Sequence, residues 1–167
     1  MKAYRVHEYG DAAKFIEDEV NKPSAKKGHV VVEVKASSLN PIDHKFLKRD
    51  LGINPALPGI LHMDVAGVIT EVGEGVTAFK TGDEIYGCAG GLQGEAGNIE
   101  GALADFMLAD SNLIALKPKS LSFSESAALP LVTITAWEGL FDRAHIKKED
   151  HVLIHGGTGG VGHIAIQ

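Results

Sequence analysis

Residues 151–162 read HVLIHGGTGGVG, and this run decides how the second part of the chain is organised. Its first part is an apolar stretch that is typical of a buried strand. Three glycines with the spacing G-x-G-x-x-G follow (Gly157, Gly159 and Gly162), and a helix is expected from Val161 onward. A strand, a glycine turn and the start of a helix predict the first half of a β-α-β unit.

Each glycine of this loop has its own reason to be there if the loop binds a dinucleotide. Gly157 permits the sharp turn, Gly159 lets the backbone approach a pyrophosphate, and Gly162 lets the helix pack closely on the strand. Free N–H groups at the helix start, which includes Gly160 and Val161, would face the phosphates. A tight turn without a ligand has the same spacing and stays the alternative. The residue that chooses NAD or NADP would follow about 20 residues later, beyond this sequence.

Most of the sequence before the glycine loop has the pattern of short strands and turns. Three runs predict strands, and they are residues 30–36, 64–72 and 84–86. Gly73-Glu74-Gly75 predicts a turn after the second run, because glycine takes positive φ without strain. Residues 87–101 hold six glycines and predict a surface loop. Roughly the first 115 residues therefore predict a barrel or a sandwich.

Helical patterns begin after Pro118. Ser122, with Glu125 close behind it, predicts a capped helix start. Pro130 predicts an interruption of that helix, because proline cannot donate a backbone hydrogen bond. A second helix is expected from about residue 133 to residue 144.

The composition excludes several classes of protein. The net charge of −6 and the pI of about 5.7 argue against a nucleic-acid partner, which requires a basic face. Cys88 is the only cysteine, so neither an internal disulfide nor a zinc site of several thiolates can form. The N-terminus is polar where a signal peptide is apolar, and no apolar run approaches the roughly 20 residues of a transmembrane helix. We therefore expect a soluble cytoplasmic protein with no membrane partner.

Four stretches together resemble one family. The glycine loop with Gln167 after it resembles the cofactor loop of the zinc-free quinone oxidoreductases (ζ-crystallins), which belong to the medium-chain dehydrogenase/reductase superfamily. Thr158 is a minor departure, because the family usually has a second small residue there. The other stretches are VGEGVTAFKTGDEI at 72–85, ASSLNPID at 36–43, and the segment 127–137 that contains AALP and TAW. They occur in the family's order along the chain.

The resemblance implies a mixed α/β fold in two parts. A GroES-like β-barrel domain would occupy residues 1–120, and linker helices with the truncated start of a Rossmann dinucleotide-binding domain would occupy residues 121–167. It also implies an active site between the two domains, and NADPH-dependent reduction of quinones or α,β-unsaturated carbonyls. Because most of the second sheet is absent from the sequence, we expect the 167-residue chain to be inactive, with residues 145–167 frayed or paired with another copy.

The zinc-dependent relatives are the nearest competitor. They hold the catalytic metal with a cysteine, a histidine and a further cysteine or acid. The resemblance places those positions at Asn40, Met63 and Leu131, and neither methionine nor leucine replaces such a ligand for zinc. A displaced site formed by His62 and Asp64 is the alternative. The lobe that carries a four-cysteine structural zinc in those relatives holds a single cysteine here, so we expect no zinc.

Without a metal, the plausible chemistry is direct hydride transfer assisted by a donor near the substrate oxygen. The resemblance places Asn40 and Asp43 on the active-site side of the barrel, and it implies Lys45 as a donor to the cofactor ribose or the substrate oxygen. Thr133 and Thr135 would meet the nicotinamide end of NADPH. Each role has an ordinary alternative: a turn cap before a proline, a solvated surface lysine, and helix packing.

Three hypotheses follow for the function. The first is an oxidoreductase that uses NADPH to reduce a small-molecule quinone or enone and that forms a homo-oligomer. The second is a non-catalytic barrel fragment or module. The third is a zinc alcohol dehydrogenase, which the residues at the ligand positions disfavour. Titration with NADPH, together with metal analysis, separates the three.

Overall fold

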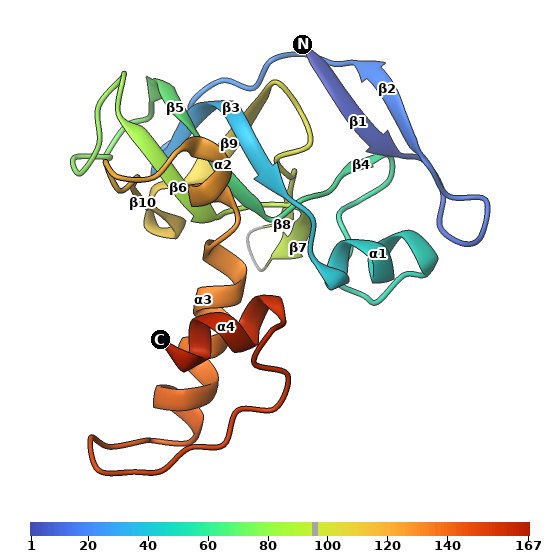
Figure 1. Cartoon of the computed structure of the whole chain (residues 1–167). Coiled ribbons are helices and arrows are strands. Elements are labelled where there is room, and N and C mark those ends of the chain that lie inside the picture. The colour runs from blue at the N-terminus through green and yellow to red at the C-terminus, as the bar shows by residue number, and fades with distance from the viewer. Residues whose placement is uncertain (95–96) are drawn as a thin grey trace.

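The computed structural model describes residues 1–94 and 97–167, and its larger part is built from antiparallel strands (Figure 1). Five strands form one sheet in the order β10-β6-β5-β3-β9. Their bounds are His29–Ser38 (β3), Asp64–Val72 (β5), Glu84–Cys88 (β6), Phe106–Asp110 (β9) and Ile114–Leu116 (β10). The three predicted strands are therefore confirmed, and they are neighbours in this sheet.

A smaller sheet near the N-terminus has the order β2-β1-β4. Its strands are Lys2–Val6 (β1), Phe15–Glu19 (β2) and Gly59–Ile60 (β4). The sequence does not indicate β2, because its run FIEDE is mostly acidic. Side chains of the neighbouring strand β1 stabilise it: Lys2 Nζ lies 2.9 Å from Glu17 Oε1, and Tyr4 OH donates to Glu17 Oε2 at 2.9 Å. Cross-strand pairs of this kind stabilise a ladder whatever the propensity of one strand.

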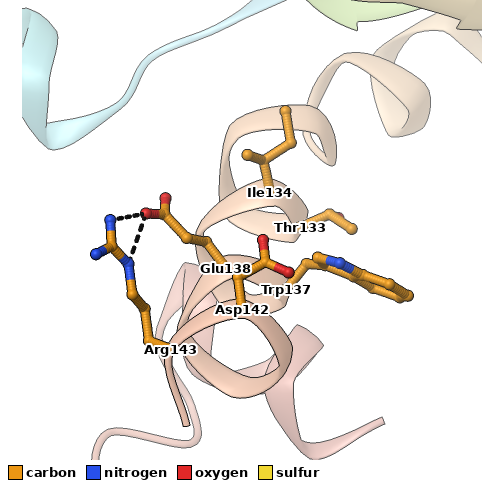
Figure 2. A pocket seen from close by; sticks show the side chains of 6 residues that line it. All are labelled: Thr133, Ile134, Trp137, Glu138, Asp142 and Arg143. Atoms are coloured by element: carbon orange, nitrogen blue, oxygen red, sulfur yellow. Dashed lines mark hydrogen bonds and ion pairs between the residues drawn. The ribbon is translucent and has the colours of Figure 1, made fainter. Parts of the chain in front are cut away.

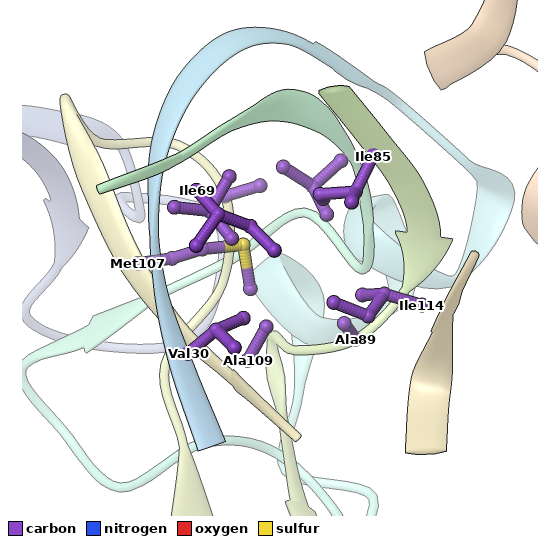
Figure 3. Close-up of a cluster of buried hydrophobic side chains, with 10 residues drawn as sticks. Val30, Ile69, Ile85, Ala89, Met107, Ala109 and Ile114 are labelled. Carbon is purple, nitrogen blue, oxygen red and sulfur yellow. The ribbon is translucent and has the colours of Figure 1, made fainter. Parts of the chain in front are cut away.

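The main hydrophobic core is formed by side chains from the five-stranded sheet (Figure 3). Burial alternates along β6 and β9: Ile85 is fully buried, whereas its neighbours Glu84 and Tyr86 are not. In β3 and β5, by contrast, several consecutive residues are buried. The buried members include Val30, Ile69, Ile85, Ala89, Met107, Ala109 and Ile114. These residues come from strands that are distant in sequence, so the core itself holds the barrel-like part together.

The helix α1, Pro41–Lys48, is fixed to the smaller sheet by a second cluster. Phe46 is fully buried there with Val6 and Leu61. Pro41 occupies the first helical position, where a missing N–H group is tolerated. This anchoring gives the residues around the helix start a defined position, and the start follows the end of β3 by two residues.

Residues 87–101 do not form the expected surface loop throughout. Residues 89–91 are buried, and a two-stranded hairpin follows them, with β7 at Leu92–Gly94 and β8 at Gly97–Ile99. The glycines allow close packing rather than exposure: a Cβ on Gly101 would collide with the carbonyl of Leu61. Residues 95–96 of this expected loop lie outside the described residues.

The helices that follow are short. They are η1 (Ser111–Leu113), α2 (Phe123–Ala127), α3 (Pro130–Trp137), the π-helical η2 (Glu138–Arg143) and α4 (Gly160–Ile166). The predicted cap is confirmed, since Ser122 Oγ accepts from Glu125 N at 3.2 Å. The interruption expected at Pro130 is confirmed, because α2 ends at Ala127 and Pro130 begins the next helix, where proline costs no hydrogen bond; that helix starts three residues earlier than predicted. The helical path then continues through η2.

Residues 151–154 have no regular secondary structure, so the prediction of a strand there is wrong. Leu153 is 79% exposed. A strand needs neighbours that accept its backbone hydrogen bonds, and no strand in the described ranges pairs with this run. The predicted helix start is present as α4, which packs against α3 away from the strands (Figure 1).

None of the helices in the described part of the chain is long and apolar enough to cross a membrane.

Candidate active site

Three polar side chains meet where β3 ends and β5 begins. Asp64 Oδ2 accepts hydrogen bonds from Ser38 Oγ and from Asn40 Nδ2, both at 2.8 Å. Ser38 and Asp64 are direct partners in the β3–β5 ladder, so the strand register itself brings them together. Asn40 and Asp64 are both buried. A buried carboxylate is costly unless donors surround it, and these two side chains are its donors on one side.

The other oxygen of Asp64 is bonded to a distant element. Leu131 N donates to Asp64 Oδ1 at 2.9 Å, across 67 positions of sequence. Leu131 is the second residue of α3, so this bond joins the strand domain directly to the helix. Sequence reasoning considered Asp64 as a possible metal ligand in a displaced site with His62 and missed this contact. Its signal is a charged residue at the head of an otherwise apolar strand, DVAGVI.

Asp43 is fully buried and accepts hydrogen bonds from two backbone groups. Asn40 N donates to Asp43 Oδ2 at 2.8 Å, and His62 N donates to Asp43 Oδ1 at 3.1 Å. His62 itself has a left-handed φ of 70°, and its Nδ1 lies 2.9 Å from Ser37 Oγ. Asp43 therefore joins the start of α1 to the segment before β5, and both of its oxygens are engaged.

Burial alters the acidity of three groups in this cluster. It raises the pKa of Asp64 above the ordinary carboxyl value, although the hydrogen-bond donors around Asp64 act in the opposite direction. It lowers the pKa of His62, against the attraction of two nearby carboxylates. It also raises the pKa of Cys88 to about 12, and the negative charge of Asp64 adds to that effect. At neutral pH the Cys88 side chain is consequently a thiol.

Lys45 does not join this cluster. It lies on α1 two residues after the buried Asp43, and it is exposed. Residues two apart on a helix point to different faces, so the two side chains diverge. The structure thus brings Asn40 and Asp43 together and leaves Lys45 on the outer surface of the same helix.

Two of the three positions that the sequence resemblance assigns to zinc ligands, Asn40 and Leu131, are hydrogen-bonded to Asp64. Asn40 donates its amide to Asp64, and Leu131 donates its N–H group to the same carboxylate. For the displaced alternative, His62 Nδ1 is already paired with a serine hydroxyl. Within residues 1–94 and 97–167, no three His, Cys, Asp or Glu side chains are grouped so that they could hold a metal ion.

The glycine loop closes on its own backbone. Gly159 N donates to the Gly156 carbonyl at 2.9 Å, and Gly156 has a φ of 71°. A Cβ on Gly162 would collide with that same carbonyl, which is why the helix needs glycine there. A cavity of about 420 Å³ lies beside the loop, and its lining includes Gly159, Val161, Gly162 and, from α3, Thr135. Four of the predicted cofactor residues therefore border one cavity.

The two remaining glycines of the loop are in contact with neighbouring helical residues. A Cβ on Gly157 would lie 2.6 Å from Ile166 Cδ1, and a Cβ on Gly160 would lie 3.3 Å from Val132 Cγ1. Gly160 is the first residue of α4, and Val132 is a buried residue of α3. The small residues of the loop thus allow α4 to lie close against α3.

Thr133 and Thr135, which were expected to act together, border different cavities. Thr133 lines a second cavity of about 560 Å³ with Trp137 and with the ion pair between Glu138 and Arg143, whose atoms are 2.7 Å apart (Figure 2). Thr133 also lines a third cavity of about 470 Å³ on the side of β6. Both threonines are exposed, so neither is committed to core packing.

Residues 26–119 match the family described as the alcohol dehydrogenase GroES-like domain. This range contains α1, β3 to β9 and the Asn40–Asp64 cluster, and it covers more than half of the chain. The chain belongs to this family. The strand domain is accordingly the GroES-like domain of the medium-chain dehydrogenase/reductase fold, which confirms the superfamily and the fold class expected from the sequence.

Curated relatives of this GroES-like protein are oxidoreductases. The chain is 40% identical, over its whole length, to the 2-methylene-furan-3-one reductase of Solanum lycopersicum and covers 43% of it. It is 36% identical, again over its whole length, to the NADPH-dependent alkenal/one oxidoreductase of Arabidopsis thaliana and covers 44% of it. With 97% of its length it is 34% identical to the quinone oxidoreductase of Rattus norvegicus, of which it covers 47%. The chain thus spans about half the length of the curated relatives it matches.

Solved structures show the same partial match. An alcohol dehydrogenase superfamily protein from Novosphingobium aromaticivorans superposes with a TM-score of 0.91 at 40% identity, and the match covers 99% of this chain and 49% of that one. The quinone oxidoreductase of Coxiella burnetii superposes with a TM-score of 0.81 at 31% identity, over 99% and 52% of the two chains. The arrangement of α3 and α4 on the strand domain is therefore part of the matched fold, since nearly all of this chain is included.

Proposed function

We propose that the full-length protein containing this chain reduces quinones or α,β-unsaturated carbonyls with NADPH, by direct hydride transfer and without zinc. The observation that carries the proposal is the Asn40–Asp64 hydrogen bond, which engages an amide at the position of a cysteine ligand in zinc-dependent relatives. The names of the relatives from tomato, Arabidopsis and rat support the substrate class. An asparagine amide is not among the thiolate, imidazole and carboxylate groups that hold zinc in proteins.

NADPH would be held by the glycine loop. The residues fit such a cofactor, because Gly162 lies where a Cβ would collide with Gly156, and because Gly159 and Val161 border a cavity of about 420 Å³. Gly157 and Gly160 complete the loop. When bound, the cofactor supplies a hydride, which is chemistry that protein side chains cannot perform.

The chain's own groups would orient the reactants and stabilise charge on the substrate oxygen. Asn40 and Asp43 act in this proposal as positioning residues at the wall of the site, since both are buried and hydrogen-bonded. Lys45 supplies the mobile donor, because its side chain is exposed and its flexible stem ends in three N–H donors. Thr133 and Thr135, both exposed residues of α3, would meet the nicotinamide end of the cofactor in this proposal.

We also propose the two-part division that the sequence suggests, with the GroES-like domain at residues 1–120 and the start of the dinucleotide-binding part at residues 121–167. The capped helix start at Ser122 supports a boundary near residue 120, since the last strand, β10, ends at Leu116. Limited proteolysis that produced a stable fragment ending near residue 120 would support the division, and a stable fragment ending near residue 100 would contradict it.

The experiment that tests the function uses the full-length protein. NADPH oxidation is followed with 1,4-benzoquinone, with a short enone and, in the reverse direction, with a simple alcohol and NADP. We expect turnover of the quinone or the enone and little oxidation of the alcohol, because no metal is expected to acidify a hydroxyl group here. Metal analysis accompanies the assay. Efficient alcohol oxidation without reduction of either acceptor, or about one tightly bound zinc per chain, would contradict the proposal.

A further inference from the structure

Asp64, in β5, lies where four other structural elements meet it. It is the first residue of β5, and the ladders pair it with Ser38 at the end of β3 and with Cys88 at the end of β6. Its carboxylate also accepts from Asn40, directly before α1, and from Leu131 in the first turn of α3. The residue is fully buried, so none of these partners can be exchanged for water without opening the structure.

The helix α3 depends on this carboxylate for its N-terminal cap. The residue before the helix, Leu129, has an αR backbone conformation and no side-chain acceptor. The first backbone N–H groups of a helix have no partner within the helix, and a negative charge near them is favourable. Pro130 has no N–H group, so Leu131 N is the first donor, and Asp64 Oδ1 accepts from it at 2.9 Å. The cap therefore comes from the strand domain.

The parts expected to contact the cofactor lie on or against α3. Thr135 Oγ1 donates to the carbonyl of Leu131 at 2.7 Å, which ties that threonine to the residue that Asp64 holds. Thr133 stands between them on the same helix. The position of the glycine loop also depends on α3, because the Val132 side chain of α3 lies beside Gly160 at the start of α4. A shift of the first turn of α3 would thus move both threonines and the loop relative to the strand domain.

We propose that Asp64 is a positioning residue that fixes α3, and with it the cofactor-binding groups, relative to Asn40 and the substrate side of the site. One oxygen holds the helix and the other holds Asn40, so a single carboxylate sets the spacing between the two sides. The inference rests on the proposed function for its kinetic consequence, but not for the contact itself. A misplacement of about 1 Å between reactants can lower turnover roughly 100-fold, so such a residue affects rate more than binding.

A first experiment tests the contact on the 167-residue chain by hydrogen exchange of the Leu131 amide. Asp64→Ala removes the acceptor, whereas Asp64→Asn keeps an amide oxygen for Leu131 and allows the Asn40 amide to rotate. We expect exchange at Leu131, measured relative to Val31 in the core, to become at least about tenfold faster in Asp64→Ala and to stay close to the parent in Asp64→Asn. Ile69→Ala, in the strand core, is the control and should affect Val31 and Leu131 alike. Unchanged relative exchange in Asp64→Ala would overturn the proposal.

A second experiment measures rate in the full-length protein. In Asp64→Ala we expect kcat for quinone or enone reduction to fall roughly tenfold to 100-fold with a smaller change in KM for NADPH, and Asp64→Asn to recover most of the loss. Thr133→Ala should lower kcat in the parent but have little further effect in Asp64→Ala, because the threonine is already displaced. Ile69→Ala should keep its kcat below its melting temperature.

The two experiments separate the possible failures. A full-length protein that reduces neither quinones nor enones contradicts the proposed function. In that case the positioning proposal is decided by two other measurements on Asp64→Ala, the exchange rate of the Leu131 amide and the Kd for NADPH. Asp64→Ala with faster exchange but parental kcat and Kd would overturn the positioning role. If Asp64→Ala does not fold, Asp64→Ser replaces it, because the shorter serine side chain cannot span from β5 to Leu131 N, and unchanged relative exchange at Leu131 in Asp64→Ser would overturn the proposal.

Discussion

Cys88 lies directly opposite Asp64 in the ladder between β6 and β5, so the only thiol of the chain faces a buried carboxylate. The two side chains shift each other's pKa in opposite directions, because contact with the Cys88 thiol lowers the pKa of Asp64 while Asp64 raises the pKa of Cys88. Burial and the charge of Asp64 raise the pKa of Cys88 to about 12. A cysteine in such surroundings is held as a thiol, which is the unreactive form.

The first prediction is that Cys88 is alkylated slowly in the folded chain. At pH 8 a thiol with a pKa of about 12 is ionised on the order of 10³-fold less than an ordinary cysteine, because the ordinary pKa is about 8.5. We expect iodoacetamide labelling, followed by intact mass, to be slower by about that factor than in concentrated urea. The chain has one cysteine, so each molecule gains a single adduct. Similar labelling rates in buffer and in urea would contradict the prediction.

The second prediction concerns stability against pH at His62. Burial lowers the pKa of His62 in the folded chain below its ordinary value of about 6.5. The unfolded chain then binds the proton first, so this stabilisation is complete above about pH 6.5 and is lost as the pH falls towards the folded-state pKa. His62→Asn removes the titration and suits the left-handed φ of 70°. Urea midpoints between pH 5 and 8 should vary less in the variant; an equally steep dependence would refute the assignment.

The third prediction compares two glycines in the helical part. A Cβ on Gly162 would collide with the carbonyl of Gly156, whereas a Cβ on Gly139 meets nothing within 4 Å. Gly162→Ala should weaken NADPH binding to the full-length protein roughly tenfold or more, because a strained contact costs about 1–3 kcal/mol. Gly139 borders the same cavity but has room for a Cβ, so Gly139→Ala should change the Kd far less than Gly162→Ala and stabilise the helix slightly. Fluorescence titration measures both, and equal affinities for the two variants would show that the loop tolerates a side chain at Gly162.

The fourth prediction tests the strand core. Ile69 is 1% exposed and Met107 is 2% exposed, and both belong to the main cluster. Ile69→Ala should lower the free energy of unfolding by about 2–5 kcal/mol, since it leaves a cavity. Met107→Leu nearly conserves volume and should cost less than about 1.5 kcal/mol. Urea unfolding gives both values, and a loss for Ile69→Ala no larger than that for Met107→Leu would place Ile69 outside the core.

The parts of this fold that the sequence predicted are those that local pattern determines. The strand over residues 64–72 has an apolar run at 65–69, and the cap at Ser122 needs only the residues next to it. The glycine loop is equally local, since the collision that forbids a Cβ on Gly162 comes from Gly156, six positions earlier. Such features leave a readable signal because their partners are close in sequence.

The features that the sequence did not predict depend on distant partners. The acidic strand β2 forms because β1 lies beside it. Residues 151–154 form no strand, which agrees with the fraying expected for residues 145–167, but α4 in the same range packs against α3, which was not expected. The contact of Asp64 with Leu131 spans 67 positions. No window of sequence contains both partners, so propensity and periodicity cannot report these pairings. The candidate site depends most on contacts of this kind.

The last prediction separates two lysines on α1. Lys45 and Lys48 are both exposed on this helix, but Lys48 Nζ is paired with Asp11 at 2.9 Å on the surface. An exposed ion pair contributes little to stability, so Lys48→Met should leave the full-length protein folded and active. Lys45→Met should lower kcat/KM for enone or quinone reduction by about 100-fold if its ammonium assists the substrate oxygen. If Lys45 instead binds the cofactor ribose, the KM for NADPH should rise while kcat changes little, because the lost contact exists before and during the reaction. Steady-state kinetics with both substrates varied distinguishes the two patterns, and Lys45→Met with the same constants as Lys48→Met would remove Lys45 from the site.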